Sequence, residues 1–150
     1  MIEIRAAGAA DAETLSRLRA ASLIEQGHLS ETERDVFTRR ATGDITRLFA
    51  DGRLVAMLLL DGTCGVGSAC ATYFERLPFP DGTLHAELSG VYVEPAYRGA
   101  GHGTRLVSAV VEAMRVSGAR RTFLRPSPGA RTLYARLGFV EDRVGVMTLA

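Results

Sequence analysis

Apolar and polar residues follow two different periods in the first part of the chain. Ile2 and Ile4 alternate with charged residues, which predicts a short strand. Over residues 15–23 the apolar positions recur at helical spacing, so we expect a helix there. Asp11 is expected to cap its beginning and Gly27 to end it.

A second helix is expected to begin at Ser30-Glu31-Thr32-Glu33, which has the sequence of a capping box. In that arrangement the serine accepts a hydrogen bond from the first turn, and the glutamate reaches back to the serine. The helical pattern weakens at Thr42-Gly43-Asp44, because glycine destabilises a helix interior. Beyond that point we expect only a short helical turn, through Phe49.

The middle of the chain has the pattern of an antiparallel meander. Aspartate-glycine pairs, which favour tight turns, separate segments rich in aliphatic and aromatic residues. The pairs are Asp51-Gly52, Asp61-Gly62 and Asp81-Gly82, and the expected strands span about 53–60, 65–75 and 83–93.

The last third alternates helices with strands. A glycine-rich loop, 98–103, precedes a helix that ends at Gly118, and 122–124 reads as a short strand. A helix of about ten residues is expected to begin at Ser127-Pro128, with Ser127 as its cap, and a last strand from Phe139 onward. The order β-α-α-β-β-β-α-β-α-β defines an α+β (mixed α/β) fold, expected as a single domain over 1–150.

Composition narrows the range of functions and locations. A chain of 150 residues with a net charge of +1 has no basic excess for nucleic acid, so such a partner is not expected. The longest aliphatic run, Leu54 to Leu60, is too short to span a membrane, and the N-terminus does not resemble a secretory signal. We therefore expect a cytoplasmic protein. Its basic residues are all arginine and it has no asparagine, which suggests a GC-rich bacterial genome.

The two cysteines are expected to be buried and unpaired. Cys64 and Cys70 are six residues apart in a strand-like segment, too far apart for a disulfide unless the chain folds back. No histidine or carboxylate stands at a spacing that would complete a metal site with them. We therefore expect no metal.

The glycine-rich loop 98–103, which precedes the third expected helix, has the composition of a phosphate-binding turn. A glycine-rich turn between a strand and a helix leaves backbone N–H groups at the positive end of the helix dipole. Its spacing, Gly99-x-Gly101-x-Gly103, differs from the dinucleotide-binding fingerprint. A P-loop is excluded because the chain contains no lysine.

Two segments resemble the GNAT superfamily of N-acetyltransferases. Arg98-x-x-Gly101-x-Gly103 directly follows Val91-Tyr92-Val93-Glu94-Pro95 and resembles the family's acetyl-coenzyme A motif. The segment Leu133-Tyr134-Ala135-Arg136-Leu137-Gly138-Phe139 is similar to a second motif of the family. The resemblance implies an acetyl-CoA-dependent acyltransferase with a sheet that opens beside its fourth strand. The residues implied to hold acetyl-CoA are Val91, Val93, Arg98, Gly99, Ala100, Gly101, His102, Gly103 and Thr104.

The same resemblance implies two catalytic residues. Tyr134 matches the position of a tyrosine that protonates the coenzyme A thiolate, and Glu87 that of a general-base glutamate. Each has a structural alternative: helical spacing makes Tyr134 a core residue with an exposed hydroxyl, and Glu87 could face solvent. The backbone N–H of Val93 is implied to polarise the thioester carbonyl.

The expected reaction is transfer of an acetyl group to a primary amine by direct attack. A small-molecule amine is favoured over a peptide or protein amine. The alternative is a non-catalytic acyl-CoA-binding sensor or assembly module of the same fold. The strand expected at Val144 to Leu149 would either lie exposed or pair with a second copy in a homodimer.

Overall fold

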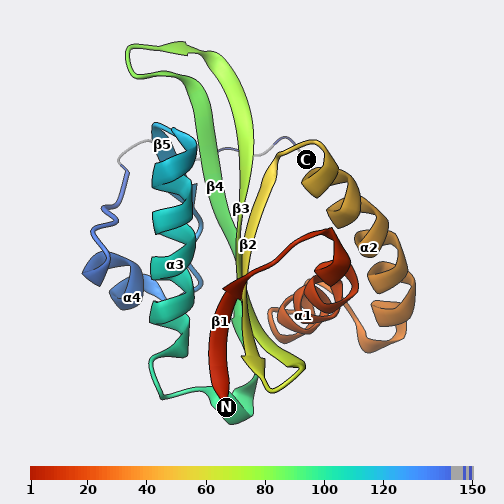
Figure 1. Ribbon diagram of the computed structural model, residues 1–150. Coiled ribbons are helices and arrows are strands. Elements are labelled where there is room, and N and C mark those ends of the chain that lie inside the picture. The colour runs from red at the N-terminus through yellow and green to blue at the C-terminus, as the bar shows by residue number, and fades with distance from the viewer. Residues whose placement is uncertain (143–146, 148, 150) are drawn as a thin grey trace.

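A computed structural model describes residues 1–142, 147 and 149 of the chain (Figure 1). Within these residues a five-stranded sheet has the order β1-β2-β3-β4-β5. Its strands are β1 (Ile2–Ala6), β2 (Leu54–Asp61), β3 (Cys64–Phe79), β4 (Gly82–Val93) and β5 (Arg121–Leu124). The helices are α1 (Ala12–Glu25), α2 (Arg34–Ala50), α3 (His102–Ser117) and α4 (Arg131–Arg136), with short 3-10 turns at Ala9–Asp11, Glu31–Glu33 and Pro95–Tyr97.

Helices cover both faces of the sheet, with α1 and α2 on one side and α3 and α4 on the other (Figure 1). Each face has its own buried cluster, because alternate residues of a strand point to opposite faces. The cluster on the α3 face includes Leu59, Val66, Leu106, Val107 and Val110. The cluster on the α1 face consists of Leu15, Leu18, Ala56, Leu58 and Leu60. The mixed α/β class expected from the sequence is confirmed.

The predicted meander is also confirmed. Strands β1 to β4 pair antiparallel in chain order, and β4 pairs parallel with β5. The glycines of the three turn dipeptides have positive φ, which a residue with a side chain rarely adopts. Their φ angles are +65° at Gly52, +59° at Gly62 and +111° at Gly82.

The second helix is longer than the sequence pattern indicated. Helix α2 runs without interruption through Gly43 to Ala50, so the weakening expected at Thr42-Gly43-Asp44 was wrong. Ile45 and Phe49, which follow the glycine, pack against the cluster on the α1 face. This packing outweighs the low helix propensity of one exposed glycine.

The side chain of Asp11 does not cap the first helix as expected. The residue stands at the N-cap of α1, but its carboxylate accepts no hydrogen bond from the first turn of that helix. The carboxylate accepts instead from the backbone N–H of Gly8 at 2.9 Å and from both terminal nitrogens of Arg5. The guanidinium of Arg5 lowers the pKa of Asp11 to about 2.

The predicted helix at Ser127 begins later and is shorter. Residues 128–130 form a turn, closed by a hydrogen bond from Ala130 N–H to the carbonyl of Ser127, and α4 covers only Arg131–Arg136. Ser127 is therefore not a helix cap. Arg125 and Ser127 each precede a proline, which disfavours helical backbone at both positions.

The prediction that both cysteines are buried and unpaired was partly correct. Cys64 is exposed next to the turn that joins β2 to β3, so its predicted burial was wrong. Both cysteines are free, as expected, and burial raises the pKa of the Cys70 thiol to about 12.

A last strand was expected from Phe139 onward, but residues 139–142 do not form a strand. The part of the expected strand at Val144 to Leu149 falls largely outside the described residues.

Candidate active site

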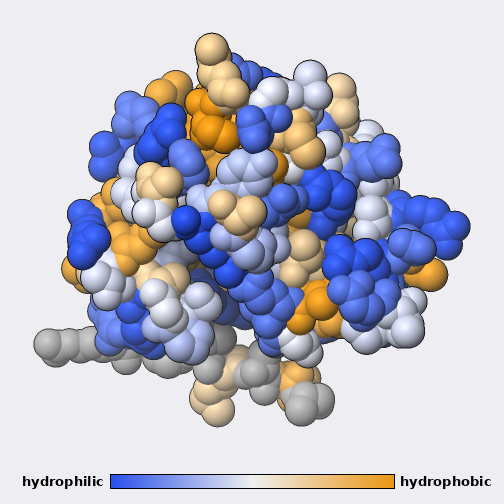
Figure 2. All heavy atoms as spheres, turned by 90° about the horizontal axis from the view of Figure 1, so that it is seen from below, coloured by the Kyte–Doolittle hydropathy of each residue, from blue (hydrophilic) through white to orange (hydrophobic). Residues whose placement is uncertain are grey.

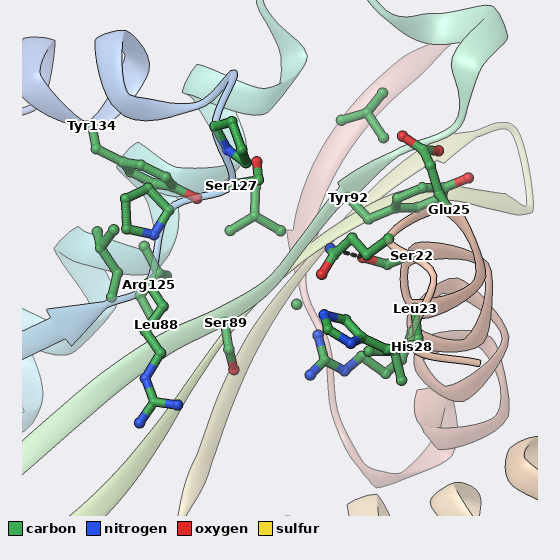
Figure 3. Close-up of a pocket in the computed structure, with 18 of the residues that line it drawn as sticks. Ser22, Leu23, Glu25, His28, Leu88, Ser89, Tyr92, Arg125, Ser127 and Tyr134 are labelled. Carbon is green, nitrogen blue, oxygen red and sulfur yellow. Dashed lines mark hydrogen bonds between the residues drawn. The ribbon is translucent and has the colours of Figure 1, made fainter. Parts of the chain in front are cut away.

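The sheet opens between β4 and β5. Their pairing ends where Leu88 lies opposite Leu124, whereas β4 continues to Val93. A cavity of about 850 Å³ occupies this opening, between the unpaired part of β4, the end of α1 and the segment after β5. It is lined, among others, by Glu87, Ser89, Val91, Val93 and Tyr134, and Figure 3 shows the cavity with its labelled side chains.

A bulge in β4 lies beside the opening. Ser89 pairs with Cys70 and Tyr92 with Ser68, so two residues of β4 stand opposite one residue of β3. Gly90, in the bulge, has a φ of +62°, and its carbonyl accepts a hydrogen bond from the Ser68 hydroxyl at 3.0 Å. The bulge therefore has a glycine at a position where a side chain would strain the backbone.

The backbone of Val93 faces the cavity. Glu94 donates its N–H to the carbonyl of Val66 on β3 at 2.9 Å. Successive residues of a strand direct their backbone groups to opposite edges, so the N–H of Val93 lies on the edge toward β5. The same alternation applies to Val91, two residues earlier. Backbone donors of this kind can pair with an extended chain or polarise a carbonyl.

The glycine-rich loop forms a cradle for an anion at the beginning of α3. Gly99 and Gly101 have φ angles of +85° and +79°, and Gly101 is the N-cap of the helix. A Cβ at either glycine would meet no atom within 4 Å, so the space beside the loop is open to a ligand. Helix N-terminal N–H groups and the helix dipole favour a phosphate there. The residues present thus fit the diphosphate of coenzyme A.

A second cavity, of about 420 Å³, lies over this loop and borders the first. Both are lined by Val93, Arg98 and Ser127, so the loop and the opening in the sheet are adjacent. The loop lies at the lower end of the molecule in Figure 1, and the view from below shows a largely hydrophilic face with scattered apolar residues (Figure 2). The predicted loop residues Gly99, Gly101, His102, Gly103 and Thr104 line the second cavity.

Arg98 already has protein partners. Its guanidinium forms an ion pair with Glu25 at 2.7 Å and donates to the carbonyl of Val93 at 2.8 Å. It also lies 5.5 Å from the ring centre of Tyr92. The hydrogen bond to Glu25 raises the pKa of Arg98. Arg98 thus connects the end of α1 to the end of β4, a positional role that the sequence did not indicate.

Two of the other predicted loop residues have smaller roles in the structure. The Nδ1 of His102 lies 3.3 Å from the guanidinium of Arg105, within the first turn of α3. Ala100 is exposed and does not line either cavity.

Tyr134 joins the core to the cavity. Only 8% of the residue is exposed, and its ring packs edge-on against Phe139 with 5.8 Å between ring centres. The hydroxyl points toward the cavity in Figure 3. Burial raises the pKa of this phenol, so it remains protonated at neutral pH and can donate a proton. Both interpretations made from the sequence therefore describe part of its environment.

Glu87 lines the same cavity from β4. It is half-buried on β4 opposite Thr72, and its side chain points to the α1 face, since Ala86 and Leu88 belong to the cluster on the α3 face. Within the described residues Glu87 has neither an ion pair nor a side-chain hydrogen bond. Ser89, two residues along the strand, shares its face and also lines the cavity. A carboxylate so placed can accept a proton from a bound amine.

Sequence reasoning missed most of the wall formed by α1. The side chains concerned occupy the end of α1 and the loop after it, where no motif marks them. Gln26 donates to the hydroxyl of Ser22 at 3.0 Å, and His28 faces the cavity from the same side (Figure 3). One signal was available for Arg125, which directly follows β5, the strand that pairs with β4 next to the opening. The lining residues that the sequence did not single out are Arg19, Ser22, Leu23, Glu25, Gln26 and Arg125.

An opening in a mixed sheet beside a glycine-rich anion cradle is the architecture of an acyl-CoA-dependent transferase. Residues 17–139 match the family model described as Acetyltransferase (GNAT) family. The chain therefore belongs to the GNAT family, and it is an acetyl-CoA-dependent acetyltransferase with acetyl-CoA as co-substrate. A search of curated proteins finds no match.

Solved structures have the same fold at low sequence identity. A GCN5-related N-acetyltransferase from Ralstonia eutropha is 21% identical with a TM-score of 0.81, and the match covers 99% of each chain. A predicted acetyltransferase from Clostridium acetobutylicum with acetyl-CoA is 20% identical with a TM-score of 0.83, covering 99% of this chain and 96% of the other. An aminoglycoside N-acetyltransferase in complex with CoA is 19% identical with a TM-score of 0.76, covering 100% of this chain and 95% of the other.

No helix in the described part of the chain is long and apolar enough to cross a membrane. Among the same residues, no group of three or more histidine, cysteine, aspartate or glutamate side chains could hold a metal ion.

Proposed function

We propose that the protein transfers the acetyl group of acetyl-CoA to a primary amine of a small molecule by direct attack. The observation that carries this proposal is that one cavity is lined by a carboxylate, a buried phenol and an unpaired strand edge. These are Glu87, Tyr134 and the backbone from Val91 to Val93. Amide formation needs a proton acceptor for the amine, a donor to the carbonyl oxygen and a proton for the thiolate.

Glu87 is assigned the role of proton acceptor. An amine attacks only in its neutral form, and most primary amines are protonated at neutral pH. The carboxylate lines the cavity without an ion pair inside the described chain, so it is available to receive that proton at an Oε atom. Ser89, on the same face, can hold a water between the carboxylate and a more distant amine.

Tyr134 is assigned the role of proton donor. When the amine attacks the thioester of acetyl-CoA, the C–S bond breaks and coenzyme A leaves as a thiolate that must be protonated. The raised pKa of the buried phenol keeps its proton in place until such a base is nearby. Tyr134 projects from the wall opposite α1, so the donor and the acceptor of protons lie on different elements, α4 and β4.

The backbone orients the co-substrate. The N–H groups of Val91 and Val93 face the opening, where they can pair with an extended arm as an added strand does. The loop from Gly99 to Thr104 holds the diphosphate at the beginning of α3. Together these groups place the thioester between β4 and β5.

The test is release of free thiol from acetyl-CoA across a panel of amines, with the products identified by mass spectrometry. We expect thiol release that depends on the amine and yields the N-acetyl product. A protein that binds acetyl-CoA but acetylates no small amine, peptide or protein amine would instead be an acyl-CoA-binding sensor or assembly module. Acetylation of protein amines alone would overturn the small-molecule part of the proposal.

A further inference from the structure

The charged residues that line the large cavity are not all neutralised by one another. Arg98 is paired with Glu25, and this pair leaves no net charge. Arg19, Arg125 and Glu87 also line the cavity, and none of them forms an ion pair within the described residues. Two positive charges and one negative charge are therefore available to a ligand.

Arg19 approaches the cavity from α1. Burial raises the pKa of the Cys70 thiol, and the charge of Arg19 acts in the opposite direction, which places the guanidinium near that cysteine. Cys70 on β3 is the register partner of Ser89 on β4. Arg19 therefore lies over the part of β4 where its pairing with β5 has ended.

Arg125 approaches from the opposite wall. Thr122 contacts Met114 of α3 and Leu124 packs against the cluster on the α3 face, so the residue between them, Phe123, faces the α1 side. Phe123 on that side pairs with Glu87. Arg125 follows two positions later, and Figure 3 shows Ser89 between Arg125 on one wall and His28 on the other.

These arginines are separate from the phosphate cradle. The second cavity, over the glycine-rich loop, is lined by neither Arg19 nor Arg125. Both lie in the same cavity as Glu87, on the α1 side of the sheet. The anion that they attract is therefore not the diphosphate of coenzyme A.

We infer that the acceptor is a small amine that also carries an anionic group, a carboxylate or a phosphate, which Arg19 and Arg125 bind while Glu87 faces the amine. Guanidinium groups bind both kinds of oxyanion with two parallel hydrogen bonds. A compound with several positive charges meets two uncompensated arginines, which lowers its affinity. This inference rests on the proposed function and specifies its acceptor.

The first experiment compares matched acceptors on the wild-type enzyme with saturating acetyl-CoA. Amino acids are paired with their carboxamides, phosphoethanolamine with ethanolamine, and spermidine represents the polycations. We expect kcat/KM to be at least about tenfold higher for the anionic member of a pair. Preference within the amino-acid pairs identifies a carboxylate, and preference for phosphoethanolamine identifies a phosphate. Equal or better use of neutral or polycationic amines would overturn the inference and leave the proposed function intact.

The second experiment tests the two arginines directly. Arg19→Gln and Arg125→Gln are each expected to raise KM for the preferred anionic acceptor at least about tenfold, with little change for its neutral counterpart. Arg39→Gln, at an exposed position of α2 outside both cavities, is the control and should change neither. Equal losses for the charged and neutral acceptors would indicate a structural role and contradict the inference. If no amine is acetylated although acetyl-CoA binds, the proposed function itself fails, and this inference with it.

Discussion

Strand β4 pairs with β3 both before and after Leu88, but its other edge has different surroundings in the two parts. From His85 to Leu88 the strand pairs with β3 and with β5, and three of these four side chains are at most 3% exposed. From Ser89 to Val93 it pairs with β3 alone, and its other edge borders the cavity. A single strand thus contributes its paired end to the core and its open end to the site.

The difference arises from the chain that follows β5. The segment Arg125-Pro126-Ser127-Pro128 contains two prolines, which have no backbone N–H to continue a ladder. On β4 itself, the bulge at Gly90 disturbs the regular pairing at the same level. The pairing of β4 with β5 therefore ends beyond Leu88 and Leu124 for a reason that is local in the sequence.

The largest expected effect is at the open end. Tyr134→Phe keeps the ring and its packing, and removes the proton that the phenol would donate. We expect kcat to fall about 100-fold or more, with acetyl-CoA affinity and Tm nearly unchanged. The control is Tyr73→Phe, because Tyr73 lies on β3 opposite Ala86, at the paired end of β4. A near-normal kcat for Tyr134→Phe, with chemistry limiting turnover, would assign Tyr134 to the core alone.

Glu87 lies where the two ends of β4 meet, so its substitution tests how far the site extends. Glu87→Gln should lower kcat/KM at neutral pH by about tenfold or more, because the amine loses its proton acceptor. The loss should shrink as pH rises and the free amine becomes abundant. Glu75→Gln, at an exposed position of β3, is the matched control. A loss of equal size at every pH would point to substrate positioning instead of proton transfer.

Substitutions of the two glycines that flank α3 distinguish loss of the anion-binding loop from the effect of backbone strain. Gly101 and Gly118 flank α3 with φ angles of +79° and +82°, and a Cβ at either would meet no atom within 4 Å. Valine at either position therefore strains the backbone similarly. Only Gly101→Val should weaken acetyl-CoA binding, by about tenfold or about 1.4 kcal/mol, measured by calorimetry. Equal affinities of the two folded variants would refute the cradle.

The elements that depend on local signals were predictable from the sequence. Aspartate-glycine turns, alternating strands and the positive-φ glycines act over a few residues, and the structure confirms the order of elements through α4. Errors arose where packing or neighbouring prolines overrode a local preference. Helix α2 continues through Gly43 because later residues are packed, and prolines delay the beginning of α4 to Arg131.

The residues of the candidate site also differ in whether a local signal in the sequence indicates them. Gly101 and Tyr134 belong to contiguous motifs, so the sequence indicated them. Arg19 and His28 belong to no motif and reach the cavity only because α1 packs beside the open end of β4. That juxtaposition joins residues separated by about half the chain, which no periodicity within a segment can show. The acceptor wall is therefore the part of the site that required the structure.

The smallest expected effect is at the paired end, and it concerns stability. His85 is fully buried among the rings of Phe74, Phe79 and Phe123, at 5.7 to 6.0 Å between centres. Neither of its ring nitrogens has a hydrogen-bond partner in the part of the chain that the structure describes. An unsatisfied buried polar group destabilises the folded state, so His85→Phe should raise the free energy of unfolding by about 1 kcal/mol. The measurement is denaturant unfolding together with kcat/KM, which should stay unchanged because His85 does not line the cavity. His28→Phe, an exposed histidine at the open end, should bring no gain in stability. A loss of stability in His85→Phe would show that the aromatic cluster requires the smaller, polar ring, and the paired end would then be less purely a packing region than its burial indicates.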